Sequence, residues 1–128
     1  MPEILDTITG KILGKALDFS FIQHQVIANN IANINTRDYQ PLKMNLTKDF
    51  SQLIHELDQG GDINTIKNDI IATKAEIQTE SIVNGDRKLL LDEQMIALTQ
   101  NTLQYQALLS AKSKLGSILK LAISGDRN

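Results

Sequence analysis

The sequence predicts a mainly α fold in which long N- and C-terminal helices pair as a coiled-coil-like hairpin, with a small irregular, β-containing segment between them. Apolar residues recur at intervals of three and four near both ends of the chain, which is the period of an amphipathic helix. Clusters of Asn, Asp, Gly and Pro interrupt this pattern in the middle. Only 4% of the residues are aromatic, so the apolar content is mostly Ile, Leu and Ala, which suits helix packing.

The chain has 128 residues, the length of one ordinary domain. We divide it into three zones. Residues 1–40 form the N-terminal helix and the turn after it, residues 41–89 form a variable middle segment, and residues 90–128 form the C-terminal helix of the same core domain.

The first helix is predicted from about Asp6 to Ile34, with two adjacent apolar stripes. The first stripe contains Leu13, Leu17, Ile27, Ile31 and Ile34, and the second contains Ile12, Ala16, Phe19 and Val26. Asn and Asp residues followed by Pro41 end this helix, because Asn and Asp favour turns and proline disfavours the α-region for the residue before it.

The middle segment carries weaker signals. A helical pattern runs from Lys48 to Leu57 and stops at Gly60-Gly61. The β-branched run Ile70–Thr73 indicates a short strand, and the stretch Glu76–Val83 indicates another. Asn84-Gly85 is a strong tight-turn signal.

The second long helix is predicted from about Leu90 to Ile123. Asp92 and Glu93 lie in its first turns, where negative charge suits the helix dipole. Its two apolar stripes contain Leu91, Met95, Leu98, Tyr105, Leu109, Leu119 and Ile123 in one, and Ala97, Leu108, Ala111, Leu115, Ile118 and Ala122 in the other.

The apolar surface of two stripes on each helix is larger than the surface that one helix–helix seam buries. The middle segment is too short to wrap both helices, so the second stripe on each is expected to remain uncovered. Exposed apolar surface of this extent marks an interaction surface, and contacts that do not close on themselves produce filaments. We therefore expect the chain to self-associate.

Several function classes are disfavoured by the composition. A net charge of −2 and a pI of about 5.6 argue against nucleic-acid binding. There is no Cys, and His24 and His55 lack metal-ligand spacing, so we expect no metal site and no cofactor. Helix-start charge explains Asp92 and Glu93 better than acid–base catalysis does. We also expect no cleaved signal peptide and no direct membrane insertion.

Two segments carry a resemblance to a known family. The run Ala28–Thr36 (ANNIANINT), followed by Tyr39, resembles the N-terminal signature of flagellar rod, hook and hook-associated axial proteins, A-N-N-[LI]-A-N-x-x-T-x-G-[YF]. The run Leu91–Met95, then Asn101, then Leu103–Leu108, resembles the C-terminal helix of the short proximal rod proteins. The family has Gly before the aromatic residue where this chain has Asp38. Asp tolerates φ > 0 at a modest cost, which leaves the turn intact.

The resemblance implies a non-catalytic structural subunit of the basal-body rod, which transmits torque and assembles through its terminal helices. It implies a location in the periplasmic rod after flagellar type III export. The implied partners are copies of itself, other rod proteins, the rod-base adaptor and membrane ring, and the export apparatus. The alternatives are a soluble helical adaptor or chaperone that presents apolar helix faces to a partner, and a small enzyme.

The predicted assembly interface combines apolar stripe residues with the amides of the family pattern. Its members are Leu17, Phe19, Gln23, Val26, Ile27, Asn29, Asn30, Ile31, Asn33, Thr36, Tyr39, Leu91, Met95, Leu98, Asn101, Tyr105, Leu108 and Leu115. The amides either face water at a helix edge or pair with neighbouring helices and fix their register. Tyr105 either packs in the core or donates a hydrogen bond to another subunit.

Overall fold

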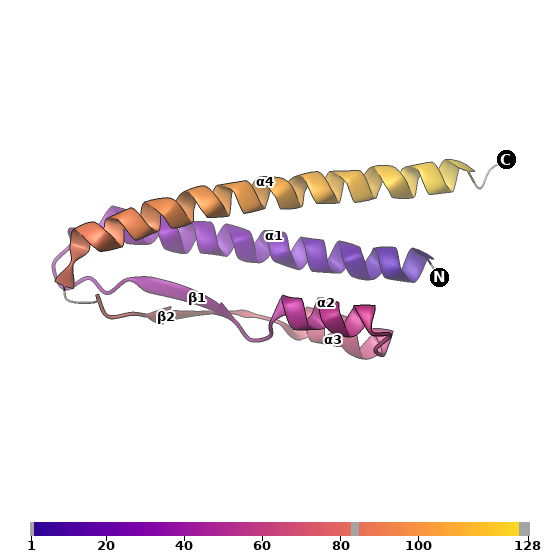
Figure 1. Cartoon of the computed structure of the whole chain (residues 1–128), viewed down its shortest axis with the longest axis horizontal. Helices are drawn as coiled ribbons and strands as arrows, with labels where there is room; N and C mark the ends of the chain where they lie inside the picture. The colour runs from indigo at the N-terminus through magenta and orange to yellow at the C-terminus, as the bar shows by residue number, and fades with distance from the viewer. Residues whose placement is uncertain (1, 83–84, 126–128) are drawn as a thin grey trace.

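Two long antiparallel helices dominate the computed structural model, which describes residues 2–82 and 85–125. Helix α1 spans Pro2–Asn33 and helix α4 spans Arg87–Gly125. The two helices pack along each other, with the chain termini at the same end (Figure 1). The predicted fold class, a mainly α helical hairpin with a small β-containing middle, is confirmed.

The middle segment contains two strands and two short helices. Strand β1 spans Leu42–Leu46 and pairs in antiparallel register with β2, Ala75–Thr79. Between the strands lie α2, Phe50–Asp58, and α3, Ile63–Ala72. The side chain of Asp49 caps α2 by accepting a hydrogen bond from the backbone N–H of Ser51. Helix α2 ends just before Gly60-Gly61, as the sequence predicts, and Gly60 adopts a φ of 77°.

The prediction of a strand at Ile70–Thr73 is wrong. Residues 70–72 form the last turn of α3, and Thr73 caps it. The β-branched composition is overridden by tertiary packing, because Ile66 and Ile70 lie one turn apart and bury their side chains together. The predicted strand Glu76–Val83 corresponds in part to β2, while Val83 and Asn84 lie outside the described residues.

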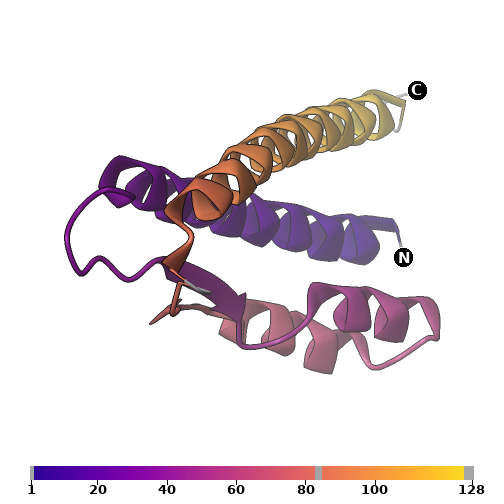
Figure 2. The same ribbon diagram turned by 60° about the vertical axis from the view of Figure 1, so that its left-hand side comes forward.

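Helix α1 lies between α4 and the middle segment in both views (Figure 1 and Figure 2). Ile8 of α1 joins Leu53 of α2 and both Ile66 and Ile70 of α3 in one buried cluster. Lys15 of α1 also donates a hydrogen bond to the carbonyl oxygen of Thr73, at 3.2 Å. The middle segment is therefore docked on α1 rather than on α4.

The expectation that the second stripe of each helix stays uncovered is wrong for α1. On α4 it is correct only in part, because Leu108 and Leu115 of that stripe are half-buried while Ile118 is exposed. On α1, Phe19 and Val26 of the second stripe are buried, and the Phe19 ring lies 5.6 Å from that of Phe50 at the start of α2. The middle segment covers this stripe because its length is concentrated on one helix. On α4, Asn101 is the only buried residue among the side chains that the structure describes.

Candidate assembly interface

Asn30 is the centre of a hydrogen-bond network where α1 ends. It is 1% exposed. Its Oδ1 accepts hydrogen bonds from the Tyr39 hydroxyl at 2.7 Å and from the Leu42 N–H at 2.8 Å. Its Nδ2 donates to the Leu42 carbonyl at 2.9 Å and to Gln94 Oε1 at 3.2 Å. Both donors and both acceptors of the amide are therefore used, and one side chain joins α1, β1 and α4.

The remaining polar residues of the signature segment, Ala28–Thr36, shape the turn. Asn29 donates to the Tyr39 hydroxyl at 2.9 Å. Asn33 donates to the Asn29 carbonyl at 2.9 Å, and Thr36 donates to Asn33 Oδ1 at 3.3 Å. These contacts lie within the chain, so here the amides fix the exit from α1 into β1.

The departure from the family pattern falls at a left-handed backbone position. Asp38 has a φ of 59°, the only positive φ of a non-glycine residue in the described part of the chain. Asp is one of the few residues that adopt this region without large strain. The turn that the family forms with glycine is thus formed here with aspartate, as the sequence predicts.

Burial raises the pKa of the Tyr39 hydroxyl above its usual 10.0, while the hydrogen bond from Asn29 opposes this effect. The folded-state pKa therefore lies above the unfolded-state pKa. The neutral hydroxyl stabilises the fold fully below pH 10.0, and this contribution is lost as the pH rises through the folded-state value. We expect the free energy of unfolding, measured with urea, to fall between about pH 8 and about pH 11. This fall should be smaller in Tyr39→Phe than in the wild type. An equal loss in both proteins would exclude Tyr39 as the group responsible.

A second polar contact crosses the seam between the long helices. Asn101 Nδ2 lies 3.1 Å from the Ser20 carbonyl oxygen and 3.3 Å from its hydroxyl. Oδ1 of Asn101 is buried and has no hydrogen-bond partner in the described part of the chain. Together with the contact between Asn30 and Gln94, this contact fixes the antiparallel register of α1 and α4, as polar residues do in helix seams.

The predicted interface residues fall into three groups by exposure. Buried within the chain are Leu17, Phe19, Val26, Ile27, Asn30 and Asn101. Half-buried are Gln23, Ile31, Asn33, Tyr39, Leu91, Leu98, Tyr105, Leu108 and Leu115. Exposed are Asn29, Thr36 and Met95. The structure thus brings the signature residues together at one end of the hairpin, and it places most of the apolar ones against the chain itself.

A set of exposed apolar residues on α4 lies outside the predicted interface. We call this set the outer ridge of α4; it consists of Leu89, Ile96, Leu103, Ile118 and Leu121, each more than half exposed. Ile96 and Leu103 each come two residues after a side chain that hydrogen-bonds α1. Two residues turn a helix by about 200°, so the ridge faces away from α1. The spacing of seven between Leu89, Ile96 and Leu103 is the signal that would have identified it.

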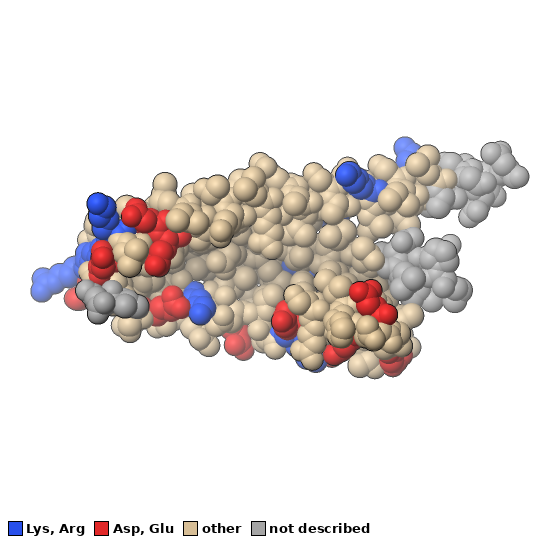
Figure 3. Space-filling view, in the orientation of Figure 1, with Lys and Arg blue, Asp and Glu red and all other residues tan. Residues whose placement is uncertain are grey.

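Charged residues are absent from the second half of α1 and from a long stretch of α4. The chain has no Asp, Glu, Lys or Arg from Phe19 to Thr36 or from Gln94 to Ala111. The space-filling view shows an uncharged surface over the middle of α4, whereas charged side chains lie at the left end of the molecule and along its lower edge, over the middle segment (Figure 3). Another protein can therefore cover this surface without burying a charge.

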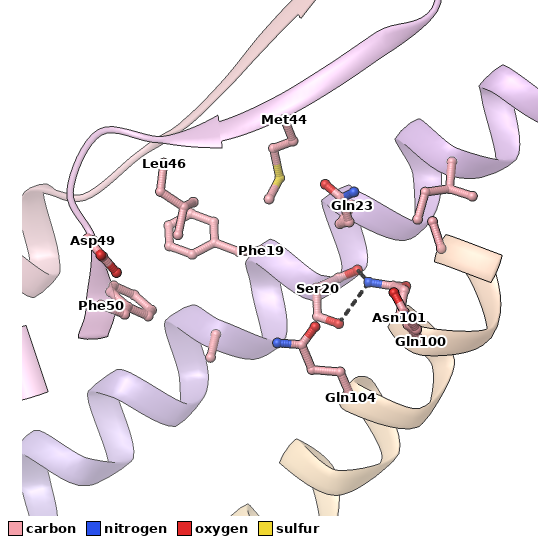
Figure 4. A pocket seen from close by; sticks show the side chains of 13 residues that line it. Phe19, Ser20, Gln23, Met44, Leu46, Asp49, Phe50, Gln100, Asn101 and Gln104 are labelled. Carbon is pink, nitrogen blue, oxygen red and sulfur yellow. Dashed lines mark hydrogen bonds between the residues drawn. The ribbon is translucent and has the colours of Figure 1, made fainter. Parts of the chain in front are cut away.

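A groove of about 420 Å³ runs between α1, α4, β1 and the start of α2. Phe19, Met44, Leu46 and Phe50 form its apolar side, and amide side chains form the other (Figure 4). Those amides belong to Gln23, Gln100, Asn101 and Gln104. The described residues include no group of three or more acidic, His or Cys side chains placed to hold a metal ion. No described helix is both long and apolar enough to cross a membrane.

Comparison with known proteins supports the resemblance carried by the two helical segments. No family model matches the chain, and no solved structure matches it. A curated protein does: the flagellar basal body rod protein FlgB of Bacillus subtilis (strain 168) is 27% identical over 125 residues. The match covers 90% of this chain and 92% of that protein, so it includes the middle segment as well as both long helices. The chain is therefore FlgB-like, because it is similar to a flagellar basal-body rod protein along nearly its whole length.

Proposed function

We propose that this chain is a non-catalytic structural subunit of the flagellar basal-body rod, which assembles through α1 and α4 and helps to transmit torque. The similarity to FlgB along nearly the whole chain supports a structural role in the rod. The single observation that carries the mode of assembly is the outer ridge of α4, which is apolar, exposed and turned away from α1.

Exposure of this ridge to water is energetically unfavourable. Full burial of a Leu or Ile side chain stabilises by about 1.5–3 kcal/mol, and each of the five ridge side chains is more than half exposed. Covering the ridge with neighbouring subunits therefore supplies several kcal/mol of association free energy per subunit. The signature turn contributes differently, because its hydrogen bonds hold the subunit in a fixed shape before it is packed.

The proposed partners are copies of this chain and other rod proteins. At the base of the rod they include its adaptor and the membrane ring. Before assembly, the subunit is a substrate of the flagellar type III export apparatus, and its final location is the periplasmic rod. The fixed fold of α1, β1 and α4 suits a subunit that bears load.

The test is the location of the chain in the cell that produces it. We expect an antibody against the chain to detect it in purified basal bodies, and deletion of its gene to abolish both the rod and swimming. Restoration by the wild-type gene is the control. A soluble adaptor or chaperone would instead stay in the soluble fraction and be missing from washed basal bodies, and that result would refute the proposal.

A further inference from the structure

We propose that the outer ridge of α4 in one subunit inserts Ile96 and Leu103 into the groove between α1, α4 and β1 of a second copy. This inference rests on the proposed function and specifies which two surfaces meet. Ile96 is 59% exposed and Leu103 is 61% exposed, so neither side chain must leave the core to reach a neighbour.

The dimensions of the two surfaces match. Ile96 and Leu103 lie seven residues apart, which is roughly 10.5 Å along the helix. The groove follows α4 from Ala97 to Gln104, also seven residues. A cavity of about 150 Å³ accommodates one benzene-sized group, so the groove of about 420 Å³ accommodates two large aliphatic side chains.

The chemistry of the groove also favours the ridge of the same protein. Its apolar side, Phe19, Met44, Leu46 and Phe50, matches Ile and Leu side chains (Figure 4). The amides of Gln23 and Gln104 make no hydrogen bond within the described residues and are available at the rim. Asp49 is the only acidic residue of the lining, and it caps α2.

The absence of charge around the ridge favours a copy of this chain over an arbitrary soluble protein as the partner. Burial of an unpaired charge is strongly unfavourable, and the ridge carries none between Gln94 and Ala111. The helix that enters the groove can therefore bring about two turns on either side of Leu103 without desolvating a charge. A helix with an ordinary density of charged residues has no stretch of this length to offer.

The contact is heterologous, because the ridge and the groove are different surfaces of one chain. Each subunit that inserts its ridge still has a free groove, so the contact propagates instead of closing as a dimer. A contact that propagates fits an elongated assembly. It also predicts a result for mixed variants that a symmetric contact does not predict.

The test uses one variant for each surface. Leu103→Lys disables the ridge, and Gln23→Arg fills and charges the groove. Ile54→Lys, at a 45% exposed position on α2 outside both surfaces, is the matched control. Sedimentation velocity over a range of concentrations gives the association state, and circular dichroism verifies that each variant is folded. If Gln23→Arg does not fold, Gln104→Arg at the exposed rim replaces it.

We expect the wild type and Ile54→Lys to form species that grow with concentration, and each surface variant to raise the dissociation constant at least tenfold. An equimolar mixture of the two surface variants is expected to form a heterodimer that grows no further, because it retains one intact ridge and one intact groove.

Three results would overturn the inference. If only Leu103→Lys prevents association, and mixing restores nothing, the ridge packs on itself or on another surface. If neither variant weakens association, self-assembly uses other surfaces, and the proposed rod function stands. If the wild type stays monomeric while the chain is present in basal bodies, the neighbour of the ridge is another rod protein, and again only this inference fails.

Discussion

The substitution Asn30→Leu is expected to lower the free energy of unfolding by about 3–5 kcal/mol, the largest effect of any single polar substitution in the chain. Asn30 makes four hydrogen bonds and is 1% exposed. A leucine removes the side-chain partner of the Leu42 N–H and C=O, and it removes the acceptor of the Tyr39 hydroxyl, which then keeps only the hydrogen bond from Asn29. Each buried polar group that loses its partner costs about 1–3 kcal/mol. Urea denaturation followed by circular dichroism measures the loss.

The matched control is Asn35→Leu, in the same turn, because Asn35 is exposed. It is expected to change the free energy of unfolding by less than about 0.5 kcal/mol. If both variants were equally stable, the network around Asn30 would not hold β1 and α4 to α1. Preserved stability with lost assembly would instead return Asn30 to the intersubunit role that the sequence first predicted.

The substitution Ile70→Ala is expected to cost about 2–5 kcal/mol and to release α2 and α3 from α1. Ile70 is 0% exposed and contributes to the cluster with Ile8, Leu53 and Ile66. A cluster of this size cannot collapse around a cavity without separating the helices that form it. Hydrogen exchange at the amides of α3, measured with the urea transition, distinguishes local release from global unfolding.

The neighbouring residue provides the control, since Ile71 is 50% exposed. Ile71→Ala should change stability by no more than about 0.5 kcal/mol, although the same atoms are removed from the same helix. Equal effects of the two substitutions would contradict the packing of α3 against α1.

Most of the helical framework could be predicted from the sequence. The periodicity gave both long helices to within four residues at each end, and the glycine pair gave the end of α2. The signature segment predicted the turn, including a residue that tolerates positive φ at Asp38. These features are local, because the chain's own periodicity and turn chemistry determine them.

The middle segment shows where local signals are insufficient. The β propensity of Ile70 and Ile71 favours a strand. In the folded chain they belong to a helix, because Ile70 packs in the buried cluster beside Ile66, one helical turn earlier. Strand β1 was not predicted, because its pairing partner β2 lies about thirty residues later in the chain. Pairing over such a distance leaves little trace in either segment alone.

The sequence by itself determined that this protein is a long-helix hairpin with long uncharged stretches and a resemblance to flagellar rod proteins, because periodicity, composition and motif spacing are properties of single segments. Only the tertiary structure decided which apolar stripe is covered. By docking β1, α2 and α3 on α1, it buried Phe19 and Val26 and left Ile96 and Leu103 of α4 in solvent. The physical reason is that burial depends on which elements meet in space, and amphipathic stripes on several helices allow more than one such arrangement.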